Sequence, residues 1–141
     1  MRILGIDYGT KRIGLAVSDP LGITSQGLQT LEHKGEKNVL EGLKKVCQEY
    51  GVDEIVIGFP INMDGSQGPK AKEVTELVPK IEAATGKPVK TWDERLTSRQ
   101  VGRLMIEEGL SRRKQKSHSD QLSAILILQG YLDSRRTQFN P

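Results

Sequence analysis

The first part of the chain carries short apolar runs separated by turn residues. The runs "RILGIDY" and "RIGLAVS" flank a turn at Gly9, a pattern that predicts a β-hairpin. A third strand is expected around "GLQTLE". Three antiparallel strands are therefore predicted to come first.

The apolar positions then change to helical spacing. Between Lys37 and Tyr50 they predict an amphipathic helix that ends at Gly51. "EIVIGFP" follows as a strand buried on both faces. After the loop "INMDGSQGP", Pro69 is well placed to open a second helix, and Pro79 should kink that helix or end it early.

The rest of the chain predicts one more strand and two more helices. "PVKTWD" is the fifth strand, and a capping box over 97–100 opens a helix that runs to about Glu108. We expect "SRRKQKSH" to be a basic loop. "SDQLSAILILQGYLDSRR" is predicted to be a final helix, largely buried because apolar residues surround most of it.

This order of elements predicts an α/β fold. Strands that alternate with helices in the second half imply parallel pairing through right-handed crossovers. A mixed five-stranded sheet that begins with a hairpin, has the strand order 3-2-1-4-5 and carries helices on both faces is the layout of the ribonuclease H-like fold. We expect one such domain over residues 1–141.

Composition narrows the setting. The chain is 35% hydrophobic and 28% charged, which is typical of a globular domain. Its lone cysteine, Cys47, excludes a disulfide framework and a cysteine-based metal site. The N-terminus lacks a secretory signal, and no run reaches the ~18 apolar residues of a membrane helix. We therefore expect a cytoplasmic protein with no membrane partner.

Cations gather locally, although the net charge of +3 is only mildly basic. Two cations, Lys11 and Arg12, follow the opening turn, and four more lie in the basic segment: Arg112, Arg113, Lys114 and Lys116. Such clusters suit phosphate backbones, and a solvated loop is the alternative.

Three acids stand at predicted strand or helix ends. Asp7 is in line with Ile3 and Gly5 on a strand expected to be central, where a carboxylate is costly unless a cation or hydrogen bonds compensate it. The alternative is a turn acid that binds backbone amides. Asp120 is predicted to open the last helix, where an acid also complements the helix dipole.

Asp93 and Glu94 both end the fifth strand, and either could instead pair with Arg95. The first and fifth strands should lie about 10 Å apart, at ~4.8 Å per step. The longer side chain of Glu94 closes that gap better than Asp93 does.

Three converging carboxylates would form an oxygen-only site suited to Mg²⁺ or Mn²⁺. Such a site can activate a water and stabilise the leaving oxygen of a phosphodiester. His33 and His118 are isolated in the sequence, so nothing indicates zinc.

Four segments together resemble the YqgF family of bacterial proteins, also called RuvX-like: "RILGIDYGTKRIGLAVSD", "EIVIGFPINMDGS", "WDERLTS" and "SDQLSAILILQGYLD". The family is described as Holliday-junction resolvases and as nucleases that mature the precursor of small-subunit ribosomal RNA. The resemblance covers essentially the whole chain and implies the ribonuclease H-like fold and metal-dependent phosphodiester hydrolysis.

The resemblance also implies roles for particular residues. Asp7, Glu94 and Asp120 match the family's acids and would be the metal ligands. Lys11, Arg95 and the segment 112–116 would position phosphates of structured nucleic acid rather than read its sequence. One position departs from better-characterised resolvases of this fold, because Ser123 stands where they carry a further acid.

Two rival functions remain open. The opening motif is similar to the phosphate loop of the actin, Hsp70 and sugar-kinase superfamily, but those proteins need two lobes, and a single domain cannot build their cleft. A nucleic-acid-binding module without catalysis is the other alternative. The pattern does not separate RNA from DNA, and a junction substrate would require two sites and hence a homodimer.

Overall fold

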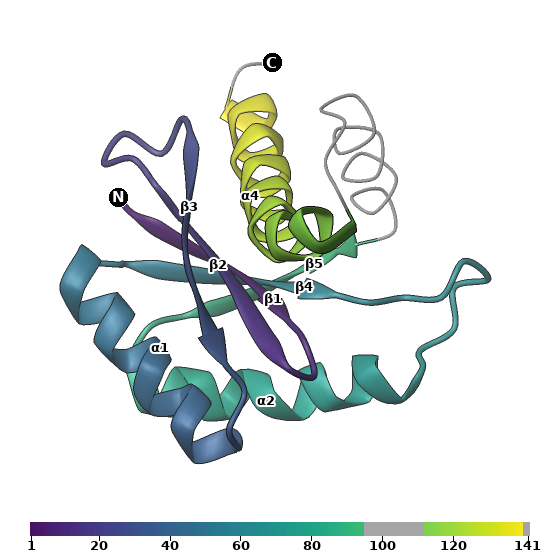
Figure 1. Ribbon diagram of the computed structural model, residues 1–141. Helices are drawn as coiled ribbons and strands as arrows, with labels where there is room; N and C mark the ends of the chain where they lie inside the picture. Colours follow the sequence, from purple (N-terminus) through teal and green to yellow (C-terminus); the bar gives the residue numbers. More distant parts are fainter. Residues whose placement is uncertain (95–111, 140–141) are drawn as a thin grey trace.

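The described part of the chain forms one mixed sheet with helices on both faces (Figure 1). The structure is a computed structural model that describes residues 1–94 and 112–139, with side chains described to 94 and from 121 to 135. Its strands are β1 (Ile3–Tyr8), β2 (Arg12–Ser18), β3 (Ser25–Glu32), β4 (Glu54–Phe59) and β5 (Val89–Asp93). Its helices are α1 (Glu36–Tyr50), α2 (Pro69–Thr85) and α4 (Arg112–Phe139).

The sheet has the order β3-β2-β1-β4-β5, which confirms the predicted strand order. β1 is central, antiparallel to β2 and parallel to β4. The turn between β1 and β2 is tight at Gly9, since a Cβ there would collide with the carbonyl oxygen of Arg12. Helix α1 ends at Gly51 as expected, with that glycine in the left-handed region that favours the residue.

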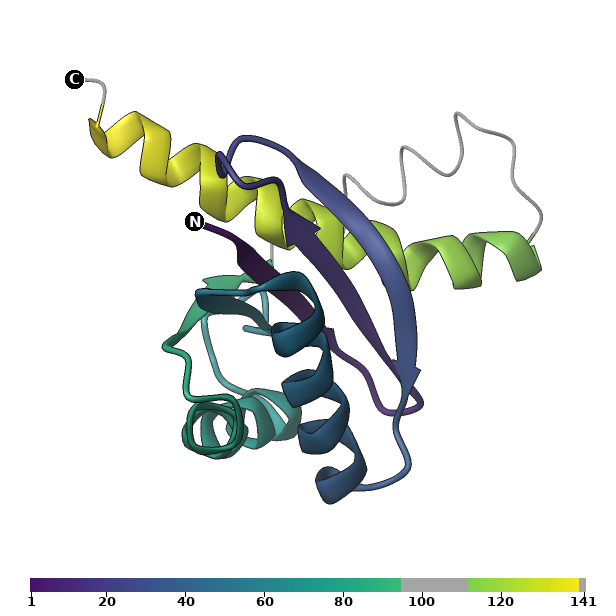
Figure 2. The ribbon, with the colours of Figure 1, turned by 90° about the vertical axis from the view of Figure 1, so that its left-hand side faces the viewer.

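The two faces of the sheet are covered by different helices (Figure 2). Leu4, Ile6 and Tyr8 of β1 point to the face covered by α1 and α2, where most of the large aliphatic side chains gather. Ile3 and Gly5 point to the face covered by α4. Asp7 therefore belongs to the α4 face by strand alternation, as the period-two pattern predicts.

Helix α4 lies close to the sheet because its face of the sheet is built from small residues. A Cβ on Gly5 would lie 2.8 Å from Cβ of Leu128 and 3.1 Å from the carbonyl oxygen of Ala124. The buried residues of α4 are Ala124, Ile127, Leu128 and Leu132. The helix is thus buried along one side and half-buried on much of the rest of residues 121–135, rather than buried all round.

A polar cluster holds α4 at the amino end of β4. The buried carboxylate of Glu54 accepts hydrogen bonds from the Tyr131 hydroxyl at 2.6 Å and from the Arg135 guanidinium at 3.0 Å. The Tyr131 ring also packs edge-on against Trp92, with centroids 6.4 Å apart. Since a buried acid is costly without partners, this cluster disfavours sliding of α4 along the sheet.

One local prediction was wrong, and at Pro79 one of the two predicted outcomes, an early end of the helix, is excluded. Helix α2 does not end early at Pro79 but continues to Thr85, because Leu77 and Ile81 are buried on either side of the proline and hold both halves against the core. The basic segment is not a loop, since α4 already begins at Arg112. Between Arg112 and Asp120 there is no glycine or proline, and arginine, lysine and glutamine favour helix.

The helix predicted from the capping box at 97–100 to Glu108 lies outside the described residues. In the described part of the chain, none of the helices has the length and apolarity that crossing a bilayer requires.

We expect Gly5→Ala to lower the free energy of unfolding by about 1–3 kcal/mol, because the added methyl meets the backbone of α4 and must displace the helix. Chemical denaturation measures the change. Gly27→Ala is the matched comparison on the same face, since its Cβ would meet the flexible tip of Ile125 at 3.1 Å. A Gly5 variant no less stable than the Gly27 variant would contradict close packing of α4 on β1.

Candidate active site

Asp7 lies half-buried near the carboxyl end of the central strand, between two glycines. Gly14 of β2 is its partner in the antiparallel register. The parallel register pairs Ile6 with Ile57, so its continuation brings Asp7 beside Gly58 of β4. Neither neighbour has a side chain, which leaves room for other groups beside the carboxyl of Asp7.

Glu94 reaches this space from the far side of β4. It follows β5 directly, and alternation puts it on the α4 face with Trp92, while Asp93 falls on the opposite face. A Cβ on Gly58 would collide with Oε1 of Glu94 and with Ile127 of α4. The carboxyl of Glu94 thus lies over Gly58, beneath α4.

The two carboxyl groups are hydrogen-bonded to each other. Burial, the negative charge of Asp7 and the hydrogen bond to Asp7 raise the pKa of Glu94 to about 8. Two carboxylates this close cannot both stay ionised without a cation, so here they share a proton. The space between the two carboxyl groups can therefore be occupied either by a proton or by a cation.

A divalent metal ion fits this donor set. Both groups are hard oxygen donors, and their mutual repulsion is the charge a divalent ion would neutralise. Within the described residues, no group of three or more His, Cys, Asp or Glu side chains could hold a metal, and Asp7 and Glu94 form a pair of candidate ligands. Asp120 is the third acid predicted from the sequence.

Asp120 does not open α4, contrary to expectation, because the helix begins at Arg112. Its backbone lies one helical turn before Ala124, whose carbonyl oxygen faces Gly5 of β1. The side chain of Asp120 lies outside the described part of the structure, as does the whole of Arg95. The same holds for the side chains of Arg112, Arg113, Lys114, Lys116 and His118.

Two cations of the opening turn are described. Lys11 is exposed and Arg12 is half-buried, both at the end of the hairpin that follows Asp7. Tyr8 is 7% exposed and lies on the opposite face of the sheet from Asp7. Trp92 is on the α4 face but packs against Gly130 and Tyr131.

Sequence reasoning missed two residues beside the acids. Lys70, the second residue of α2, lowers the pKa of Glu94 by its positive charge, against the larger raising effects. Gly58 makes room for the Glu94 carboxyl. A signal was available for Gly58, because an isolated glycine inside a buried strand indicates close approach of another group. No such signal was available for Lys70, because nothing in the sequence distinguishes it from the other lysines.

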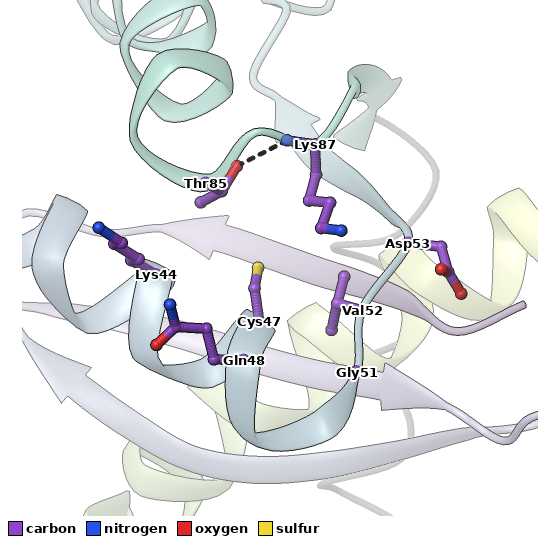
Figure 3. A pocket seen from close by; sticks show the side chains of 8 residues that line it. All are labelled: Lys44, Cys47, Gln48, Gly51, Val52, Asp53, Thr85 and Lys87. Carbon is purple, nitrogen blue, oxygen red and sulfur yellow. Dashed lines mark hydrogen bonds between the residues drawn. The ribbon is translucent and has the colours of Figure 1, made fainter.

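A separate cavity of about 300 Å³ lies at the opposite end of the sheet, beside the start of β4 (Figure 3). Figure 3 shows Lys44 and Lys87 around the thiol of Cys47. Burial raises the pKa of Cys47 to about 11, so the thiol stays protonated and unreactive at neutral pH. The cavity contains none of the predicted site residues.

Comparison with known proteins identifies the family. A family model described as "RuvX: Holliday junction resolvase" matches residues 1–134. This chain belongs to the RuvX family. A protein of Clostridium kluyveri named "Putative pre-16S rRNA nuclease" is 50% identical over 133 residues, covering 94% of this chain and 97% of the relative. A Syntrophomonas wolfei protein of the same name is 48% identical over 133 residues, with 94% of each covered.

Solved structures support the same fold for this RuvX-family chain. Thermus thermophilus RuvC in complex with a Holliday junction substrate matches with a TM-score of 0.62 and 16% identity, over 96% of each chain. The fowlpox virus Holliday junction resolvase matches with a TM-score of 0.58 and 13% identity, over 96% of this chain and 99% of that one. At these identities the likeness shows the fold alone, which is ribonuclease H-like as predicted.

The shared proton should make the stability of the metal-free protein depend on pH. The pKa of Glu94 is raised in the folded state, so its stabilising effect is complete below the ordinary value of 4.5 and is lost as the pH rises through about 8. Wild type should therefore lose on the order of 1–3 kcal/mol between pH 5 and 9 relative to Glu94→Gln.

Urea denaturation in chelator at several pH values measures this loss. Glu41→Gln, which alters an exposed acid on α1, is the matched control and should follow wild type. Parallel curves for wild type and Glu94→Gln would contradict a shared proton between Asp7 and Glu94.

Proposed function

We propose that this chain is a metal-dependent endonuclease that hydrolyses phosphodiester bonds in structured nucleic acid. The observation that carries the proposal is the pair of half-buried acids, Asp7 and Glu94, whose carboxyl groups are hydrogen-bonded at the carboxyl ends of β1 and β5. Family membership and relatives named as nucleases support hydrolysis over ATP binding. The precursor of 16S ribosomal RNA is the first candidate substrate, and four-way DNA junctions are the second.

Asp7, Glu94 and Asp120 would hold Mg²⁺ or Mn²⁺. The bound ion would lower the pKa of a water and stabilise the charge on the leaving oxygen. The chain itself contributes the rest: Gly58 keeps the space for the carboxyls, and α4 covers them. Ser123, which is half-buried in α4, supplies no fourth carboxylate, so waters would complete the coordination of the ion.

Cations around this end of the sheet would position the phosphate backbone. Those predicted from the sequence are Lys11, Arg12, Arg95, Arg112, Arg113, Lys114 and Lys116. To these we add Lys70, because its charge already acts on Glu94. Groups of this kind fix the orientation of nucleic acid and carry no sequence information. A cytoplasmic location, a single domain over residues 1–141 and, for a junction substrate, a homodimer stay predictions.

Cleavage with matched variants tests the assignment. Wild type should cut a four-way junction or a 16S rRNA precursor with Mg²⁺ or Mn²⁺ and not with chelator. Asp7→Asn should lower kcat by on the order of 100-fold or more, the range seen when one group that stabilises a transition state is lost.

Fluorescence anisotropy measures binding of the same substrates and distinguishes a nuclease from a non-catalytic binding module. A protein that binds them but never cleaves, with wild type and Asp7→Asn alike, would be a non-catalytic binding module. Equal cleavage by both proteins would indicate a contaminating nuclease and overturn the assignment of Asp7.

Lys70→Ala should weaken binding of the substrate and reduce the slope of log K against log salt by about 1, because one phosphate contact is lost. Lys70→Arg should keep both. Lys72→Ala is the control, since Lys72 is an exposed lysine on the same turn of α2. Equal effects of Lys70→Ala and Lys72→Ala would show that Lys70 acts only through the overall charge.

A further inference from the structure

His33 joins the two sides of the turn that follows Asp7. Its ring Nε2 lies 2.7 Å from the hydroxyl of Tyr8, the last residue of β1. Its backbone N–H donates to the carbonyl oxygen of Lys11, just before β2, at 2.9 Å. His33 directly follows β3, so a residue next to a third strand ties together both ends of the turn.

The hydrogen bonds assign the proton on the imidazole. The backbone N–H of Gly35 donates to Nδ1 of His33 at 3.3 Å, so Nδ1 is an acceptor. In the neutral ring the proton is then on Nε2, which donates to the Tyr8 oxygen. The two rings also contact each other, with centroids 5.3 Å apart. His33 is thus held from both sides of its ring.

These bonds add to the restraints on a turn whose flanking residues, Tyr8 and Ile13, are buried and paired in the sheet. Gly9 brings no side chain, and the exposed Lys11 side chain projects from the turn. The pairing of β2 with β3 is also irregular here, with a register shift between Ile13 and Leu15. Hairpin ends open more readily than the middle of a sheet, so the His33 bonds add to the rigidity of this end.

We propose that His33 is a positioning residue for the nucleic-acid site: by clamping Tyr8 to Lys11, it sets where the Lys11 ammonium stands relative to Asp7. This rests on the proposed function. Asp7 directly precedes Tyr8 in β1, so the clamped segment carries both the acid and the cation. His33 touches neither substrate nor metal in this scheme, and its effect is on substrate binding rather than on the chemical step.

The test compares kinetics of His33→Ala, His33→Gln and Tyr8→Phe on the cleaved substrate with saturating Mg²⁺. His33→Ala should raise KM by about three- to tenfold, which corresponds to the loss of one hydrogen bond that orders the site. The kcat should stay within about twofold of wild type. Tyr8→Phe should act in the same direction. His33→Gln should recover most of the loss, because its side-chain amide can donate to the Tyr8 oxygen.

Asn38→Ala is the matched control, an exposed polar residue in the first turns of α1, and should behave as wild type. An unchanged KM in both His33→Ala and Tyr8→Phe would overturn the proposal, and so would a fall in kcat at constant KM. If His33→Ala fails to fold, the Tyr8→Phe and His33→Gln pair gives the same decision.

Amide hydrogen exchange tests the His33 clamp independently of the proposed nuclease function. The amide at position 33 donates to Lys11, so its protection factor should fall in His33→Ala and Tyr8→Phe but not in Asn38→Ala. Lost protection in a protein that never cleaves or binds nucleic acid would refute the proposed function and leave the clamp standing as a structural device. Full protection in both variants would refute the clamp, whatever the protein cleaves.

Discussion

The carboxyl groups of Asp7 and Glu94 share a proton across β4, although their strands, β1 and β5, are not neighbours in the sheet. This contact is unfavourable once both groups are ionised, and the absence of a side chain at Gly58 makes it sterically possible. Gly58 removes the side chain that would separate them, and Ile127 of α4 closes the space above. A site under such strain is balanced by a proton or by a cation.

The unequal faces of the sheet make that contact achievable. Large aliphatic side chains fill the face under α1 and α2, where most of the buried apolar surface lies. The other face carries small residues, which let α4 approach the strands closely but bury less apolar surface. Polar anchoring by Glu54, Tyr131 and Arg135 at the amino end of β4 helps to hold α4 there, which leaves the carboxyl end free for the acids. The stabilising cluster and the candidate site thus lie at opposite ends of β4.

Much of this arrangement could be predicted from local sequence patterns, and each wrong or missed prediction has a physical reason. The alternation of Ile3, Gly5 and Asp7 assigned the acid to its face correctly, since side chains in a strand alternate with a period of two. Side-chain length favoured Glu94 over Asp93, and the structure places Glu94 beside Asp7. Arg112 was expected in a loop because charge suggested solvent exposure, yet charge does not oppose helix. Tyr8 and His33 meet because the pairing of β3 with β2 brings the end of β3 beside the turn between β1 and β2, which no local pattern records.

Local patterns predicted the order of the strands and named Asp7 and Glu94 as candidate acids, because turn residues and hydrophobic periodicity are properties of short segments. Which groups meet depends on how distant segments pack together. The approach of Glu94 to Asp7 over Gly58, the nearness of Lys70 and the bonding of His33 to both sides of the turn all join residues far apart in the chain. Such contacts depend on the register of strands and the depth of helix packing, and these are settled when the whole core assembles.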